Sequence, residues 1–164
     1  MLDYDIEKVH KFNIIIFLKI ANILYSSGKN MYKKYNIAIW RNCYLKTLVI
    51  LTLCYLKNEI FVLKEKNKIV ATFQLKMKSD SLFFEKLSTS NLHLNKGYGT
   101  ICINEIEKIA RLNNYNSIIC EVYENYEVVK DFYFKRGFNV IGNRKTNRYS
   151  LLILKKDLID YDEK

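Results

Sequence analysis

Two closely spaced glycines, Gly97 and Gly99, lie where a strand-like run of residues gives way to a helix-like run. Residues 95–100 read NKGYGT, so the first turn of the expected helix carries little side-chain bulk. Backbone amides can then approach an anion closely, and the N-terminus of a helix favours negative charge. A polypeptide needs this arrangement to bind a pyrophosphate. The same residues also suit an ordinary tight connection between a strand and a helix, so other motifs must decide.

The spacing of apolar residues predicts a chain that mixes helices with strands. A period near 3.6 residues indicates an amphipathic helix, whereas short β-branched or aromatic runs between turn residues indicate strands. Gly28 can supply a left-handed cap to the helix expected over 12–26. Residues 43–57 predict a second helix, which is largely buried. The near-continuous apolar run 117–123 is typical of a strand with both faces covered. The expected elements are helices over 12–26 and 43–57, a hairpin over 60–63 and 69–75, a strand over 82–89, a helix over 99–112, a strand over 117–123, a helix over 127–135, and closing strands over 138–141 and 149–154.

A second motif ends the later helix, where residues 133–138 read YFKRGF. With the glycines before it, it resembles the GNAT superfamily of acyl-CoA N-acyltransferases, whose loop reads Gln/Arg-x-x-Gly-x-Gly/Ala and whose later helix ends in Tyr-x-x-x-Gly-Phe. The resemblance implies an α+β fold with a central mixed, mostly antiparallel sheet, flanked by helices and splayed at the cofactor strand. It also implies a single domain over 1–164, with a helical acceptor-side part over 1–58 and a cofactor-binding core over 59–155.

Two positions depart from the family's pattern. Leu94 stands at the Gln/Arg position of the loop, so its side chain offers no polar contact. The asparagine that usually precedes the tyrosine by seven residues is replaced by Tyr126, and Asn125 lies one residue early. Family ligands are held in this loop mostly by backbone amides, so the resemblance still implies a site for acetyl-CoA. The residues it implies for that site are Leu87, Ser88, Thr89, Leu94, Asn95, Lys96, Gly97, Tyr98, Gly99, Thr100, Asn125 and Tyr133.

Acyl transfer from a thioester to an amine requires a polarised carbonyl, a deprotonated amine and a stabilised leaving thiolate. By the resemblance, the strand over 85–89 is splayed from its neighbour, and the amides of Leu87 and Thr89 pair with the pantetheine arm. Tyr133 matches the tyrosine that family members commonly place beside the sulfur, where a phenol can donate a proton or a hydrogen bond. The alternative role of Tyr133 is a core aromatic within the run 132–134.

The group that takes the proton from the amine is left open between two carboxylates and a water relay. Glu121 stands twelve residues before Tyr133, as does the glutamate of Leu-Glu-Val segments in many N-terminal protein acetyltransferases of this superfamily. A carboxylate on a central strand is costly unless it faces water or has a partner. Glu85 competes with Glu121, because it lies on the strand expected to line the cofactor.

The net charge of +10 suits an anionic cosubstrate and does not indicate a nucleic-acid site. Of the 27 basic residues 22 are lysines, which are scattered among acidic residues, and no basic helix alternates with stacking aromatics. A dispersed positive field of this kind supplies only salt-sensitive, non-specific attraction. We therefore expect no specific nucleic-acid partner.

The cysteines and histidines do not indicate a metal centre or a hydrolase site. The cysteines form no CxxC pair and have no histidine at a zinc-ligand spacing, so each is expected to be a small buried hydrophobe. With His10 and His93 as the only imidazoles, a Ser/His/Asp site is disfavoured, and His93 is expected to be a partly exposed turn residue. The cysteines are Cys43, Cys54, Cys102 and Cys120.

The apolar stretches 12–24 and 47–56 are too short to span a bilayer. Asp3, Asp5 and Glu7 occupy the positions where a secretory leader would carry positive charge, so the expected location is the cytoplasm. No membrane partner is expected.

The sequence thus predicts an N-acetyltransferase that moves an acetyl group from acetyl-CoA to a primary amine in a ternary complex, without a metal. Two alternatives stay open, a non-catalytic module that senses acyl-CoA and a basic RNA-associated domain. The acceptor amine would belong to a small molecule or to a protein N-terminus or lysine, with the region of Trp40 as a candidate lining of its site. A homodimer is compatible with this prediction.

Overall fold

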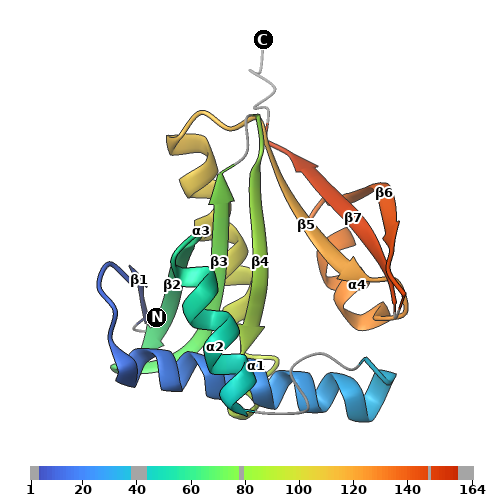
Figure 1. Cartoon of the computed structure of the whole chain (residues 1–164). Coiled ribbons are helices and arrows are strands. Elements are labelled where there is room, and N and C mark those ends of the chain that lie inside the picture. The colour runs from blue at the N-terminus through green and yellow to red at the C-terminus, as the bar shows by residue number, and fades with distance from the viewer. Residues whose placement is uncertain (1–3, 38–43, 78–79, 148, 159–164) are drawn as a thin grey trace. The chain divides into compact units, whose positions relative to one another are not determined.

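The computed structural model describes residues 4–37, 44–77, 80–147 and 149–158 (Figure 1). These residues belong to two compact units, the first unit drawn from 1–76 and 86–104 and the second unit from 77–85 and 105–164. The strands are β1 (Tyr4–Lys8), β2 (Glu59–Glu65), β3 (Lys68–Met77), β4 (Leu82–Thr89), β5 (Ser117–Tyr123), β6 (Asn139–Lys145) and β7 (Ser150–Asp157). The helices are α1 (Ile14–Tyr35), α2 (Tyr44–Tyr55), the short 3₁₀ turn η1 (Asn91–His93), α3 (Tyr98–Leu112) and α4 (Glu127–Phe134).

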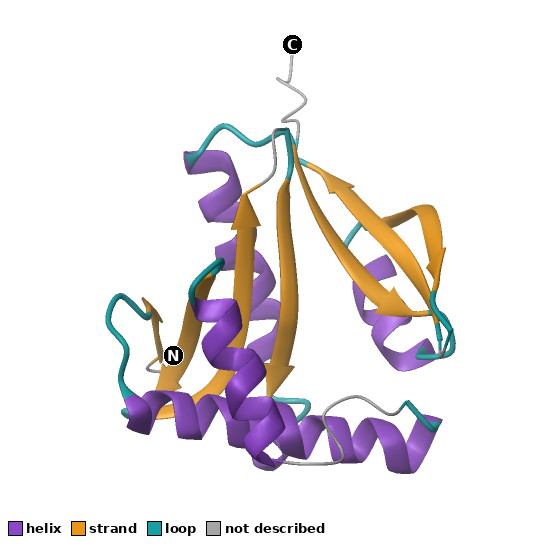
Figure 2. Ribbon diagram, in the orientation of Figure 1, coloured by secondary structure: helices purple, strands orange, loops and turns teal. Residues whose placement is uncertain are grey.

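The strands form a mixed sheet in the order β1-β2-β3-β4-β5-β7-β6. The pairings of β1 with β2, β2 with β3, β5 with β7 and β6 with β7 are antiparallel, whereas β4 and β5 run parallel. β4 and β5 begin side by side (Figure 2), and their register joins Leu82 to Ile118 and Phe83 to Ile119. Among the described residues, these two pairs are the extent of the pairing between β4 and β5. The predicted fold class, a mixed, mostly antiparallel sheet with helices, is confirmed.

The hairpin of β2 and β3 follows from its turn residues. Lys66 and Asn67 connect the strands with φ of 47° and 64°, and two positive φ values give a turn whose twist matches that of paired strands. Asparagine tolerates this conformation well, whereas lysine adopts it at a steric cost. The hairpin was predicted, and its strands are longer than the apolar runs that indicated them.

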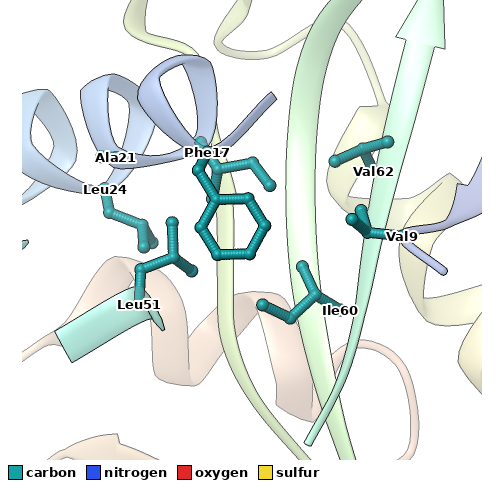
Figure 3. Packing of buried hydrophobic residues seen from close by; sticks show 8 residues of the cluster. Val9, Phe17, Ala21, Leu24, Leu51, Ile60 and Val62 are labelled. Carbon is teal, nitrogen blue, oxygen red and sulfur yellow. The ribbon is translucent and has the colours of Figure 1, made fainter. Parts of the chain in front are cut away.

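An apolar cluster holds α1 and α2 against β2 in the first unit (Figure 3). Its central side chains, Phe17 of α1 and Leu51 of α2, are fully buried, and burying one such side chain contributes about 1.5–3 kcal/mol. Side chains alternate between the faces of a strand, so Ile60 and Val62 point to the helices. The cluster comprises Val9, Phe17, Ile20, Ala21, Leu24, Leu51, Ile60 and Val62.

β1 was not foreseen, because the first part of the chain was expected to be helical. It adds an antiparallel strand to the edge of β2. Two ion pairs accompany this backbone pairing, between Glu7 and Lys64 at 2.5 Å and between Lys8 and Glu59. The hydrogen bond from Lys64 lowers the pKa of Glu7. This acidic residue therefore has a cross-strand partner.

The helix α1 extends well beyond the predicted end at residue 26. Asn13 caps its start, where its Oδ1 accepts hydrogen bonds from the amides of Ile15 at 3.0 Å and Ile16 at 3.2 Å. Gly28 is buried inside the helix, so the prediction that it forms the left-handed cap was wrong. Asn36 takes that role with φ of 54°, and its amide donates to the Tyr32 carbonyl at 2.9 Å. Apolar spacing continued too weakly past Gly28 to reveal the extra turns.

We expect Asn36→Ala to lower the free energy of unfolding by about 1 kcal/mol, because alanine loses the local polar compensation that lets asparagine adopt positive φ. Asn36→Gly is the matched control and should keep or slightly raise stability, since glycine has no Cβ to strain. Urea unfolding of both variants measures the difference. Equal free energies of unfolding for the two variants would contradict the role of Asn36 as the left-handed cap of α1.

The helix α2 lies where it was predicted, but the expectation that it is largely buried was wrong. Thr47 and Leu51 are buried, whereas Leu45, Val49 and Leu53 are 67%, 58% and 57% exposed. Apolar residues occur all round this helix, and only one face meets the cluster described above. Among the helices of the described residues, none is long and apolar enough to cross a membrane.

In the second unit, β5 pairs with β7 along its whole length, from Ser117 opposite Asp157 to Tyr123 opposite Leu151. β7 also pairs antiparallel with the edge strand β6, which precedes it in the chain and is mostly exposed. Both closing strands are longer than predicted, because charged and polar residues extend the pairing beyond the apolar runs. β5 lies between two neighbours in the sheet, as its apolar run indicated.

Candidate active site

The glycine loop, residues 94–100, leads from η1 into α3. Leu94 at its start is 48% exposed. Asn95 and Gly97 have φ of 61° and 83°, and Lys96 between them does not share this positive value. Such alternation of backbone handedness turns successive N–H groups toward one point and forms anion-binding hollows in proteins. The glycines predicted this loop, whereas the left-handed asparagine was not anticipated.

Gly97 begins the hydrogen bonding of α3. Its carbonyl accepts from the amides of Thr100 at 2.9 Å and Ile101 at 3.1 Å. The amides of Tyr98 and Gly99 come too early in the helix to have an intrahelical acceptor, and they carry the positive end of its dipole. A Cβ at Gly97 would meet no atom within 4 Å, so the glycine is required by its φ and not by a lack of space. These residues suit the binding of a phosphate group.

Tyr98 anchors the loop to the body of the first unit. Its side chain is 1% exposed, and its ring centroid lies 6.1 Å from that of His93. Burial, and then the carboxylate of Glu65, raises the pKa of the Tyr98 hydroxyl to about 12. His93 is a half-buried residue of η1, which agrees with the prediction of a turn residue. The buried Tyr98 ring therefore supports the loop from within the first unit.

The last part of β4 has one edge turned away from β3. The amide of Ser90, just after the strand, donates to the Val70 carbonyl of β3 at 2.8 Å. Amides alternate in direction along a strand, so those of Thr89 and Leu87 point to the opposite edge. Lys86, with φ of 53°, interrupts the strand just before these residues. The described structure thus directs both predicted amides away from β3.

Tyr133 of α4 is 6% exposed. Its ring centroid lies 5.2 Å from those of Phe132 and Phe138, and its hydroxyl shares a hydrogen bond with the thiol of Cys120 on β5. Burial first, and the charge of Glu121 second, raise the pKa of that thiol, and the hydrogen bond from Tyr133 opposes them. The hydroxyl therefore reaches the face of β5 that α4 covers.

Glu121 follows Cys120 on β5, so its side chain points to the other face of the strand. Its two carboxylate oxygens bind the guanidinium of Arg144 on β6, with 3.1 Å from Nε to Oε1 and 2.6 Å from Nη2 to Oε2. These hydrogen bonds and the negative charge raise the pKa of Arg144. The structure thus places Glu121 and Tyr133, two of the three predicted catalytic side chains of the second unit, at opposite faces of β5.

The other predicted residues lie as follows. Glu85 is half-buried on β4 within the second unit, and Asn125 is exposed in the turn between β5 and α4. Within the described residues, no group of three or more His, Cys, Asp or Glu side chains could hold a metal ion. The first unit contains Leu87, Ser88, Thr89 and the glycine loop, and the second contains Glu85, Glu121, Asn125 and Tyr133.

The cysteines were expected to be buried, and this is confirmed for two of them. Cys102 and Cys120 are buried, and burial raises the pKa of the Cys102 thiol to about 12. Cys54 is only half-buried, because it lies on α2, which packs through one face. Cys43, together with Trp40 and Asp3, lies outside the described residues.

Sequence reasoning missed the partner of Glu121. Arg144 lies 23 positions further along the chain, between the two closing strands that the sequence predicts. The pair forms because β7 lies between β5 and β6, and this order of strands cannot be read from local patterns.

A model of the family described as acetyltransferase (GNAT) family matches residues 26–138. Among curated proteins, no sequence matches the chain significantly. Solved structures do share its fold at low sequence identity. PH1933 from Pyrococcus horikoshii OT3 is 17% identical with a TM-score of 0.76, over 94% of this chain and 98% of that one.

Two further solved structures carry acetyltransferase names. The PaiA N-acetyltransferase of Thermoplasma acidophilum, solved in complex with coenzyme A, is 20% identical with a TM-score of 0.69, over 93% of this chain and 99% of that one. An acetyltransferase of the GNAT family from Staphylococcus aureus Mu50 is 16% identical with a TM-score of 0.69, over 94% and 100%. The family model spans well over half of the chain. This chain is therefore a member of the GNAT acetyltransferase family.

Proposed function

We propose that the protein is an N-acetyltransferase that moves an acetyl group from acetyl-CoA to a primary amine, by direct transfer in a ternary complex in the cytoplasm. The glycine loop is the observation that carries this proposal. Its left-handed residues Asn95 and Gly97 and the first amides of α3 fit a pyrophosphate, and a Cβ at Gly97 would have open space around it. The coenzyme A complex of the Thermoplasma relative supports the same ligand.

Acetyl-CoA supplies an activated acyl carbon on a thioester. The amides of Leu87 and Thr89 would hold the ligand along β4. The amine nitrogen forms a bond to the acyl carbon as the carbon–sulfur bond breaks, and the amine proton passes to Glu121, to Glu85 or to a water. Tyr133 would give its hydroxyl proton or a hydrogen bond to the departing thiolate. Pairing with Arg144 does not prevent Glu121 from accepting a further hydrogen bond, since a carboxylate offers about four acceptor positions.

Two other functions stay open and can be separated by experiment. A non-catalytic module that senses acyl-CoA would bind coenzyme A without releasing thiol when amines are offered. A basic RNA-associated domain would show no saturable coenzyme A affinity. Incubation of the protein with acetyl-CoA and a panel of primary amines, followed by measurement of free thiol, tests catalysis. Calorimetry with coenzyme A tests binding.

The loop assignment predicts that Gly97→Asp raises the dissociation constant of coenzyme A by about tenfold or more, because a carboxylate repels the pyrophosphate. Gly97→Asn is the matched control, since asparagine has the same shape and both residues tolerate positive φ. It should weaken binding less than Gly97→Asp. Calorimetry on folded variants measures both constants. Unchanged affinity in Gly97→Asp would refute the assignment of the loop.

A further inference from the structure

The face of β5 that carries Glu121 holds a polar cluster that the sequence did not indicate. Tyr123, two residues further along the strand, shares this face. Its ring meets that of Tyr149 at 5.1 Å between centroids and at 77°, an edge-to-face arrangement. Burial, and then the neighbouring Tyr149, raise the pKa of Tyr123. With Arg144 these residues place a carboxylate, a guanidinium and two phenols together within the second unit.

Both charged groups of this cluster can bind more than each other. Arg144 uses Nε and Nη2 for Glu121, and no described residue is recorded as an acceptor for its Nη1 group. Its side chain is 53% exposed and that of Glu121 is 26% exposed, so both can be reached from solvent. The cluster therefore presents a negative and a positive group side by side, each with unused hydrogen-bonding capacity.

The charges select the kind of amine that fits. A simple ammonium ion would be attracted by Glu121 but repelled by Arg144, which holds the same carboxylate. A polyamine carries several ammonium groups, and the guanidinium of Arg144 would repel each of them that comes near. An ammonium with a carboxylate on the neighbouring carbon avoids it, because its own negative group can accept hydrogen bonds from Nη1 of Arg144. The paired tyrosine rings offer an apolar surface for the rest of such a molecule.

We propose that Glu121 and Arg144 bind the amino and carboxylate groups of an α-amino acid, and that this amino acid is the acceptor of the acyl group. The proposal rests on the N-acetyltransferase function proposed above and names its substrate class. Glu121 then receives the ammonium from which the proton must leave, and Arg144 is a binding residue that sets specificity. Transfer forms the amide bond on the α-nitrogen and releases the thiol of coenzyme A.

Acceptors that differ only at the carboxylate test the proposal on the unaltered protein. Phenylalanine, phenylalaninamide and phenethylamine, and likewise tyrosine and tyramine, are offered with acetyl-CoA while free thiol is measured. We expect kcat/KM for the amino acids to exceed that for the amines by about tenfold or more, the scale of a hydrogen bond between charged groups. Phenylalaninamide, which resembles a peptide N-terminus, should fall below phenylalanine.

Arg144→Gln should remove most of this preference, because glutamine keeps hydrogen bonding but not the charge. The ratio of kcat/KM between phenylalanine and phenethylamine should fall toward one, whereas a merely structural defect would lower both values alike. Arg144→Lys should retain part of the ratio. Lys145→Gln is the matched control, since it removes the same charge from the next position of β6, which faces the other way. Its ratio should equal that of the unaltered protein.

The possible results have distinct meanings. Thiol release with the amines but no preference for amino acids would overturn the amino-acid site and leave the N-acetyltransferase function intact. A preference for phenylalaninamide over phenylalanine would overturn it in favour of a peptide N-terminus. An unchanged ratio in Arg144→Gln would remove Arg144 from the site. Absence of thiol release with every acceptor would overturn the N-acetyltransferase function, and the amino-acid site with it.

Discussion

Tyr133→Phe should lower turnover by roughly 10²-fold or more, the usual scale for a positioned general acid. Phenylalanine keeps the ring and its contacts with Phe132 and Phe138, and removes only the hydroxyl. Coenzyme A affinity should be retained, because the change removes no group from the glycine loop. Steady-state rates with an accepted amine and the melting temperature are to be measured on the same preparation.

The structure also defines the competing explanation. The Tyr133 hydroxyl is directed at the Cys120 thiol, so its removal deprives a buried group of a partner and costs about 1 kcal/mol if its role is structural. Tyr115→Phe, in the connection between α3 and β5, is the control for the same chemical change and should leave the rate unaltered. Full activity in Tyr133→Phe would exclude a catalytic role. A lower melting temperature with an unchanged rate would show that Tyr133 is a structural residue of the core.

Glu121→Gln should depress turnover by roughly 10²-fold at low pH, where removal of the amine proton limits the reaction, and less at high pH, where free amine is abundant. Acetyl-CoA affinity should hardly change. The expected loss of turnover is not explained by unfolding of the variant. Arg144 is 53% exposed, and an exposed ion pair such as that of Glu121 with Arg144 contributes only about 0–1 kcal/mol to the free energy of unfolding. The dependence of kcat on pH is the required measurement.

Two further carboxylates make this experiment decisive. Glu124→Gln changes an exposed residue just after β5 and should show the pH dependence of the unaltered protein. Glu85→Gln tests the competing base on β4. A normal pH profile in Glu121→Gln, with a shifted profile in Glu85→Gln, would transfer the role to Glu85. Normal profiles in both variants would indicate a water relay.

The parts of the fold that local patterns determine could be predicted from the sequence. β4 and β5 have the predicted bounds, because turn residues flank each apolar run. The helix α3 begins within one residue of its predicted start, since Gly97 and Gly99 mark its first turn. The glycine loop, which depends on neighbouring residues only, could therefore be proposed as a site in advance.

The parts that depend on distant partners could not be predicted. β1 is a strand because its backbone pairs with the edge of β2 along its whole length, and its own pattern is too short to show it. Lys86 adopts a left-handed conformation that its residue type does not suggest. The pairing of Glu121 with Arg144 depends on the strand order β5-β7-β6. The hydrogen bond of Tyr133 to Cys120 depends on how α4 meets β5.

The short parallel pairing of β4 with β5 bears on the order of folding. The β2–β3 hairpin closes a turn of two residues, and such hairpins form within about 1–10 μs. Leu82 can meet Ile118 only after the chain between them, with the whole of α3, has been brought back to the sheet. The entropy lost on closing a loop rises with its length, so this pairing is among the slower steps. The two strands that carry the predicted catalytic carboxylates thus come together late, after the local hairpin has provided an edge on which the rest of the sheet can assemble.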